Sequence, residues 1–241
     1  MAAMVSNPFS TRFTRPGRIE PLDGAGRCVD IEGLLGRLQG LGGTAAIVGP
    51  HGSGKSTLLA HLADAIERCG GRSSRIRLQS WRDALAAWMA IRQSAAGDTI
   101  CIDSWESIGP AIRVLLRLAA RLSGCGLLVT SHRGTGMPEL TRCGTSASLL
   151  SAIVRSLPDH ACWYETLICE ADIEAAFASH GGNLRESLYE LYDRFEARRR
   201  RVRGAWGASP DGSDGSDGGR HEIYEFTGGF SYVGAPERNL G

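Results

Sequence analysis

The sequence predicts an α/β fold with a mainly parallel five-stranded sheet, helices on both of its faces, and a small helical unit after it. Three observations predict this class. Between residues 44 and 145, short apolar runs alternate with helical segments of ten or more residues, a pattern typical of right-handed crossovers between parallel strands. A glycine-rich segment separates the first strand from the helix that follows it. After residue 146 the apolar periodicity is purely helical.

The core of the fold is expected between residues 44 and 145. Strands are predicted at 44–48, 75–79, 99–102 and 126–130, with a short fifth at 140–143. Helices are predicted at 55–68, 81–93 and 110–122. Ser80 and Asp83 form an S-x-x-D capping signature for the second helix, and Pro110 favours a helix start.

Three further parts flank this core. Residues 1–43 form an N-terminal segment with one short helix, for which Asp30 is the expected N-cap. Residues 146–203 contain three predicted helices at about 146–157, 171–179 and 184–203, separated by Pro158 and by the Gly181-Gly182 pair. Residues 204–241 combine a flexible Gly/Ser/Asp linker with an aromatic tail. A disordered end and a tail that docks on this or another molecule both remain open for that segment.

Composition narrows the functional classes. The 241 residues carry a net charge of +1, so no global field steers the protein to nucleic acid or to an anionic membrane. Seven scattered cysteines without a C-x-x-C pair disfavour a disulfide framework or a zinc site. No apolar run approaches ~18 residues, and the opening residues lack the apolar stretch of a signal peptide. We therefore expect a cytoplasmic protein without membrane insertion.

A phosphate-binding loop is the most specific feature of the sequence. The segment fits G-x-x-x-x-G-K-[ST] and lies between a predicted strand and a predicted helix. Backbone N–H groups of such a loop point at phosphate oxygens, and the helix N-terminus adds a partial positive charge. Lys55, the only lysine beside 26 arginines, would reach the β- and γ-phosphates. The candidate nucleotide-binding residues are Gly49, Pro50, His51, Gly52, Ser53, Gly54, Lys55, Ser56 and Thr57.

These residues resemble the Walker A motif of P-loop NTPases. The resemblance implies a three-layer P-loop fold that binds ATP with Mg²⁺, with the Ser56 hydroxyl as a magnesium ligand. Asp103 follows the buried run 99–102 and resembles the aspartate of a Walker B segment, which holds the metal through water. The carboxyl end of a buried parallel strand faces the ligand crevice, which supports that role.

Two further segments resemble the AAA+ branch of P-loop ATPases. The fourth strand ends in Thr130-Ser131-His132, where that branch carries a polar sensor residue; Thr130 or Ser131 would hold this position. The stretch Gly182-Asn183-Leu184-Arg185-Glu186 is similar to the sensor 2 helix of AAA+ lids. Asn183 is a suitable N-cap, and Arg185 in the first turn opposes the helix dipole unless a phosphate faces it. The resemblance implies that residues 146–203 form a lid and that Arg185 contacts the nucleotide.

One departure from the ATPase pattern keeps alternatives open. Ser104, not glutamate, follows Asp103, so Glu106 is the nearest candidate for the general base. The prediction is a Mg-dependent ATPase that couples nucleotide turnover to lid or partner rearrangement. A hydrolysis-poor nucleotide switch is the first alternative and a small-molecule kinase the second. A protein partner, a second copy of the chain, or nucleic acid at the basic run 198–201 also remain open.

Overall fold

The structure, a computed structural model, describes residues 6–207, so the predicted linker and aromatic tail lie outside the described residues. A five-stranded sheet has the order β2-β3-β4-β1-β5, and all neighbouring strands are parallel. This confirms the predicted fold class. The strands are β1 (Thr44–Val48), β2 (Ser73–Arg77), β3 (Thr99–Asp103), β4 (Gly126–Ser131) and β5 (Glu139–Arg142).

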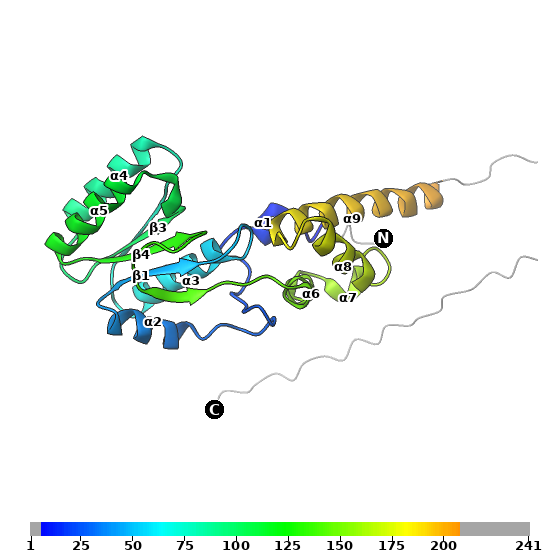
Figure 1. Cartoon of the computed structure of the whole chain (residues 1–241). Helices are drawn as coiled ribbons and strands as arrows, with labels where there is room; N and C mark the ends of the chain where they lie inside the picture. Colours follow the sequence, from blue (N-terminus) through cyan, green and yellow to red (C-terminus); the bar gives the residue numbers. More distant parts are fainter. Residues whose placement is uncertain (1–5, 208–241) are drawn as a thin grey trace, which may run out of the picture.

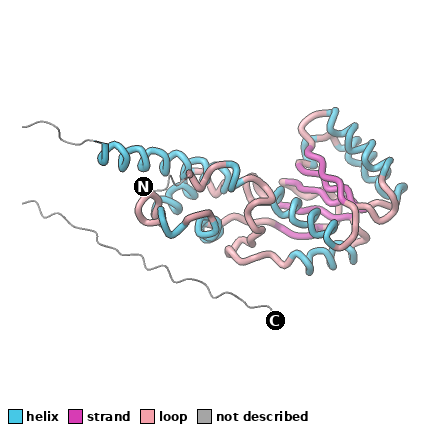
Figure 2. Tube along the Cα trace, turned by 180° about the vertical axis from the view of Figure 1, so that it is seen from behind, coloured by secondary structure: helices cyan, strands magenta, loops and turns pink. Residues whose placement is uncertain are grey.

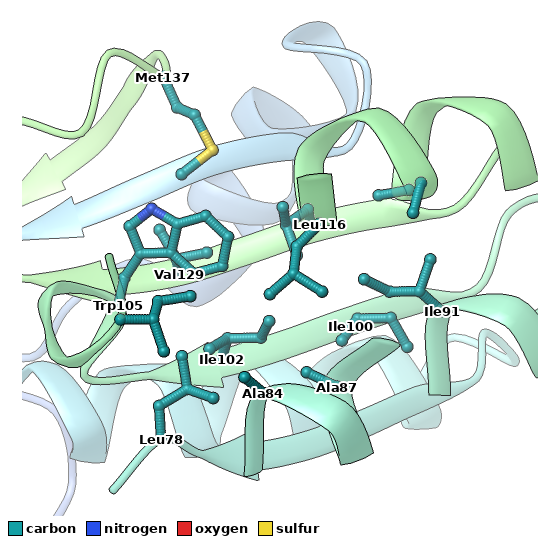
Figure 3. Close-up of a cluster of buried hydrophobic side chains, with 14 of the residues drawn as sticks. Leu78, Ala84, Ala87, Ile91, Ile100, Ile102, Trp105, Leu116, Val129 and Met137 are labelled. Carbon is teal, nitrogen blue, oxygen red and sulfur yellow. The ribbon is translucent and has the colours of Figure 1, made fainter. Parts of the chain in front are cut away.

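Helices cover both faces of the sheet, because successive strand residues point to opposite sides. In β1, Ala45 and Ile47 pack beneath α2 (Ile31–Gly40) and α3 (Lys55–Arg68). Ala46 and Val48 face the other core, beneath α4 (Trp81–Gln93) and α5 (Pro110–Ser123). Figure 1 shows α4 and α5 side by side over one face. Figure 3 shows the apolar side chains that fill the space under them.

The remaining helices form a separate layer beyond the carboxyl ends of the strands (Figures 1 and 2). They are α6 (Ala147–Ser156), α7 (His160–Trp163), α8 (Glu170–Ser179) and α9 (Leu184–Gly207). Their apolar core includes Phe9 of the N-terminal segment, just before α1 (Thr11–Thr14). The ring of Phe9 makes edge contacts with Trp163 at 5.4 Å and Phe195 at 6.1 Å between centroids. The N-terminal segment is therefore part of the helical unit's core, which its local sequence pattern did not indicate.

The basic run on α9 is partly engaged within the chain. Arg198 donates to the Leu167 carbonyl and to both oxygens of Asp172, and Arg199 donates to Glu196. Asp172 is buried, and the pairing with Arg198 and the backbone N–H of Cys169 holds the pKa of its carboxyl far below the usual range despite that burial. Arg198 therefore connects α9 to Leu167 and to Asp172 of α8, whereas Arg199 pairs within α9 itself.

Three local expectations need correction. The second strand covers Ser73–Arg77 rather than 75–79, because Gln79 and Ser80 donate backbone hydrogen bonds to Asp83 in the capping box of α4. The 3₁₀ turn η1 (Trp105–Ser107) and the four-residue helices α1 and α7 were not predicted, since such short elements leave no periodic signal. α9 continues beyond residue 203 to Gly207. In residues 6–207, no helix has both the length and the apolar character needed to cross a bilayer.

Candidate functional site

The phosphate-loop motif forms a tight loop between β1 and α3. Gly52 and Gly54 adopt left-handed backbone angles, with φ of 71° and 83°, and Gly54 is the N-cap of α3. Lys55 is only 7% exposed, and its ammonium donates to the carbonyls of Gly49 at 2.8 Å and Pro50 at 2.6 Å. The loop therefore closes around its own lysine at the N-terminus of a 14-residue helix, where an anion is favoured.

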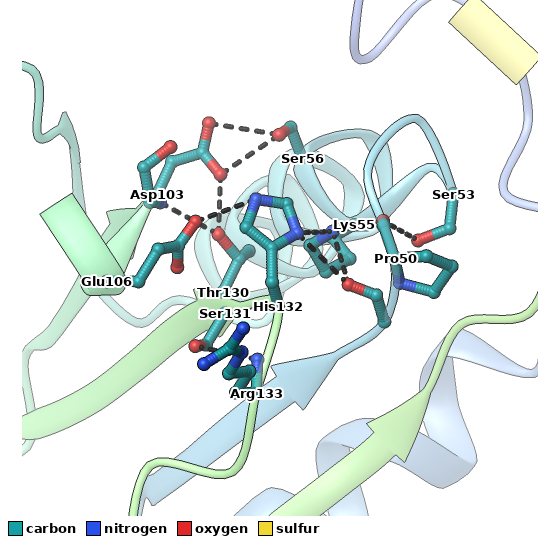
Figure 4. Close-up of polar contacts among 12 residues, drawn as sticks. Pro50, Ser53, Lys55, Ser56, Asp103, Glu106, Thr130, Ser131, His132 and Arg133 are labelled. Carbon is teal, nitrogen blue, oxygen red and sulfur yellow. Dashed lines mark hydrogen bonds and ion pairs between the residues drawn. The ribbon is translucent and has the colours of Figure 1, made fainter. Parts of the chain in front are cut away.

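Asp103 lies at the carboxyl end of β3, beside the start of α3. Ser56 Oγ is 2.9 Å and 3.0 Å from its two carboxylate oxygens, and Thr130 Oγ1 donates to Oδ1 at 2.6 Å (Figure 4). The structure thus joins residues from β3, α3 and β4 in one cluster. A hydroxyl and a carboxylate are the hard oxygen donors that Mg²⁺ prefers, so Ser56 and Asp103 fit the predicted metal roles.

Glu106 enters the site through an unusual turn. Ser104 has a left-handed φ of 65°, and the buried Trp105 anchors the 3₁₀ turn that follows. This turn brings Glu106 Oε1 within 2.8 Å of His132 Nε2, on the residue after β4. The other carboxylate oxygen, Oε2, is buried and has no hydrogen-bond partner among the described residues. A buried carboxylate oxygen without a partner carries a desolvation cost that no hydrogen bond offsets.

His132 connects Glu106 to Lys55. Its Nδ1 is 3.2 Å from Lys55 Nζ and 3.3 Å from the Gly49 carbonyl; the first contact requires Nδ1 to accept and the second requires it to donate. In the neutral ring that accepts from Lys55, the proton lies on Nε2, which donates to Glu106. Burial lowers the pKa of His132, and the Lys55 charge lowers it further, so the neutral form is favoured. Burial also lowers the pKa of Lys55, although Cys143, Glu106 and Asp103 oppose this shift.

A cavity of about 710 Å³ opens above these groups. The phosphate loop, Asp103, Glu106, Thr130 and His132 line one part of it. Another part is lined by apolar side chains from the N-terminal segment, α6 and α9, namely Ile19, Leu22, Val29, Leu149, Ile153, Leu184 and Leu188. The cavity therefore combines charged, hydrogen-bonding groups of both signs with apolar side chains in one volume.

The start of α9 lies directly against the phosphate loop. Asn183 Oδ1 accepts from the backbone N–H groups of Arg185 and Glu186, which confirms the predicted N-cap. A Cβ added to Gly52 would lie 2.0 Å from Asn183 Oδ1 and 3.2 Å from the Arg185 nitrogen. Arg185 is exposed and lines the cavity. The helical unit thus contacts the loop through the Asn183 side chain and the Arg185 backbone, and a Cβ at Gly52 would collide with that side chain.

Most predicted site residues come together in this cavity, and others are added. His51, Gly52, Ser53, Gly54, Ser56 and Thr57 line it, together with Lys55. The buried Ser131 does not line it, and its hydroxyl accepts from the Arg133 backbone, so of the two sensor candidates only Thr130 borders the cavity.

Arg77 was missed as a site residue. Its Nε lies 3.8 Å from Asp103 Oδ2. Arg77 is the last residue of β2 and is in register with Asp103 on β3. A correct prediction of where β2 ends would therefore have indicated this contact. His132 was expected only as a neighbour of the sensor position, whereas it contacts both Lys55 and Glu106. Its ring also lies 3.4 Å from that of His51 between centroids, tilted by 32°.

Comparison with known proteins gives distant likenesses among solved structures. No family model and no curated protein matches the sequence. Among solved structures, the chain is similar to Rhizobiales Trip13, with 11% identity, 73% of this chain and 78% of that chain covered, and a TM-score of 0.38. It is also similar to C. elegans PCH-2, with 10% identity, 66% of this chain and 63% of that chain covered, and a TM-score of 0.37. The chain thus spans less than two thirds of the second structure. Because both TM-scores are low, we base the interpretation of the site on its own geometry.

Proposed function

We propose that the chain binds ATP with Mg²⁺ in the 710 Å³ cavity and hydrolyses it, as a P-loop ATPase of the AAA+-like branch. The observation that carries this proposal is the junction of Lys55, Ser56 and Asp103. A loop lysine, a helix-start hydroxyl and a strand-end carboxylate meet at one helix N-terminus. This is the set of groups that phosphoryl transfer from a nucleotide requires.

Each group has a role that follows from its position. The Lys55 ammonium would leave the Gly49 and Pro50 carbonyls and donate to phosphate oxygens, which restores its hydrogen bonds within the buried loop. Ser56 and Asp103 would hold magnesium, which neutralises developing phosphate charge when bound. Thr130 fixes the Asp103 carboxylate. Arg185 would close on the nucleotide from α9.

Glu106 is our candidate for the general base. Glu106 lines the cavity, where its carboxylate would accept a proton from a water molecule, and His132 Nε2 lies 2.8 Å from its Oε1. The apolar part of the cavity suits a nucleotide base, since flat rings bind well among aliphatic side chains. We infer that the helices α6–α9 act as a lid, because α9 and the phosphate loop line the same cavity.

The experiment combines nucleotide binding with steady-state phosphate release from Mg-ATP. Lys55→Ala should lose both binding and release. Glu106→Gln should keep binding and lose release by about 10²-fold or more, as expected for a removed base. Glu174→Gln, an exposed position on α8, is the matched control and should behave as the wild type. Unchanged release in Glu106→Gln would remove Glu106 from the mechanism, and absence of nucleotide binding by the wild type would overturn the proposal.

A nucleotide-dependent switch is the second candidate. Its support is that Ser104, and not a carboxylate, follows Asp103. The candidate base, Glu106, lies two residues further on and is paired with His132. Tight Mg-ATP binding without release by the wild type would favour the switch. Phosphate transfer to an added acceptor would instead favour the third possibility, a small-molecule kinase.

A further inference from the structure

Helices α4 and α5 carry a second apolar face that the fold does not cover. Of the eleven large hydrophobic residues that are exposed in the described part of the chain, eight lie on these two helices. They include Trp81 at 70% exposure, Val114 at 63% and Leu122 at 77%. We call this surface the α4–α5 face; it consists of Trp81, Leu85, Met89, Ile112, Val114, Leu115, Leu118 and Leu122.

The α4–α5 face lies on the sides of the two helices that point away from the core. On α4, Trp81, Leu85 and Met89 recur every four residues, while Ala84, Ala87 and Ile91 point into the core. The two helices contact each other, and Figure 1 shows them side by side. An exposed apolar cluster of this kind marks an interaction surface.

The charges around the α4–α5 face are cationic. Arg82, Arg92, Arg117 and Arg121 are exposed on the two helices. The one acidic residue of these helices, Asp83, is occupied by hydrogen bonds from Gln79 and Ser80. Two such faces would repel each other, so a partner of opposite charge fits better than a symmetric pairing of the face with itself.

The chain contains a segment of matching chemistry outside the described residues. Residues 221–233, HEIYEFTGGFSYV, combine six large apolar residues with Glu222 and Glu225. The preceding segment, 208–220, adds three aspartates, and Arg220 is the one arginine or lysine in 208–233. Five carboxylates against one guanidinium make this stretch anionic and aromatic, complementary to an apolar face with an arginine rim.

The length of α9 argues against docking on the same molecule. α9 begins beside the phosphate loop and has 24 residues, about 36 Å. Figures 1 and 2 show that it runs away from the sheet, with α4 and α5 at the opposite end. The 13 residues 208–220 span at most about 45 Å when fully extended, and the return along α9 uses most of that length. A second copy has no such restriction.

We propose that residues 221–233 of one copy dock on the α4–α5 face of a second copy. The interaction is head-to-tail, because it joins two different surfaces of the same chain. The interaction does not depend on nucleotide binding, so its test is independent of the test of the ATPase proposal.

The test measures sedimentation velocity of the full-length chain over a concentration series. The wild type should associate. A face variant, Leu118→Ser with Leu122→Ser, and a tail variant, Phe226→Ser with Phe230→Ser, should each weaken association by about 30-fold or more. Val202→Ser, an exposed apolar position on α9, is the control and should associate as the wild type does. Thermal unfolding should be unchanged in the face variant, because both leucines are more than half exposed.

Mixing the two variants is the decisive step. The face variant retains an intact tail and the tail variant retains an intact face, so a labelled mixture should form the heterodimer that neither forms alone. A wild type that stays monomeric overturns the proposal. Association that survives in the tail variant, as face-to-face pairing requires, also overturns it, as does a mixture that fails to recover the heterodimer.

Discussion

Lys55 combines burial with charge, and its neighbours explain how. Two loop carbonyls and a histidine nitrogen accept from an ammonium that is 7% exposed. Such a cation needs all of its donors satisfied. His132 Nδ1 can accept from Lys55 only while its ring is neutral.

We expect a pH dependence from His132. Its pKa lies below the ordinary 6.5, so the unfolded chain takes up this proton first as pH falls, and stability declines below pH 6.5 through the folded pKa. Phosphate release should decline over the same range, because protonated His132 cannot accept from Lys55. In His132→Gln this part of the pH profile of release and of melting temperature should disappear. His180→Gln, at the end of α8, should retain it; an identical profile in both variants would contradict the assignment.

Gly52 provides a second test at the residue scale. Gly52→Ala should lower nucleotide affinity by about tenfold or more, because a Cβ at 2.0 Å from Asn183 Oδ1 would push α9 from the loop. Isothermal titration with Mg-ATP measures this loss. Gly70→Ala is the matched control: its φ of 82° brings the same left-handed strain of about 1–2 kcal/mol, but no atom lies within 4 Å of the added Cβ. Equal affinity in both variants would show that the contact has no role.

At the scale of elements, the turn η1 positions Glu106. Trp105 is fully buried among Leu78, Ile102, Val129 and Met137, as Figure 3 shows, and it anchors the turn to the core under α4 and α5. The general base candidate is thus placed by hydrophobic packing, not by the strand that carries Asp103.

Trp105→Leu should separate binding from hydrolysis. We expect the free energy of unfolding to fall by about 3 kcal/mol through the cavity left behind. Phosphate release should fall at saturating Mg-ATP while affinity changes little, since Lys55 and Ser56 are untouched. Ile91→Ala, a buried residue of the same core on α4, should cost similar stability without the loss of release. Denaturant melts and turnover of both variants decide between a positioning role and a general loss of stability.

At the scale of the whole molecule, the N-terminal segment connects the helical unit to the cavity. Phe9 is buried in the core of α6–α9, while Arg15, Pro16 and residues 19–24, on either side of Arg18, line the cavity. Ligand binding should therefore stabilise this segment against local opening.

Limited trypsin digestion should report that coupling. Mg-ATP should slow cleavage after the exposed Arg18, because the bound nucleotide opposes the local opening that cleavage requires. Cleavage after Arg92 on α4, which does not line the cavity, is the internal control and should keep its rate. Equal protection at both sites would indicate general stabilisation instead of coupling through the segment.

The sequence alone determined what short-range patterns encode. The five strands, the loop from Gly49 to Ser56 and the capping box at Ser80 follow from alternation, glycine spacing and side-chain caps within a few residues. Asp103 was predictable because strand ends in a parallel sheet share one edge.

Only the tertiary structure decided how the site is completed. The contact of His132 with Lys55 and Glu106 joins three segments, and Arg77 reaches Asp103 only through strand register. Phe9 packs with Phe195 across most of the chain, and the α4–α5 face appears only when the two helices lie together. Packing between distant residues depends on shape and burial that no local period records, and for that reason the structure was needed to assemble the site.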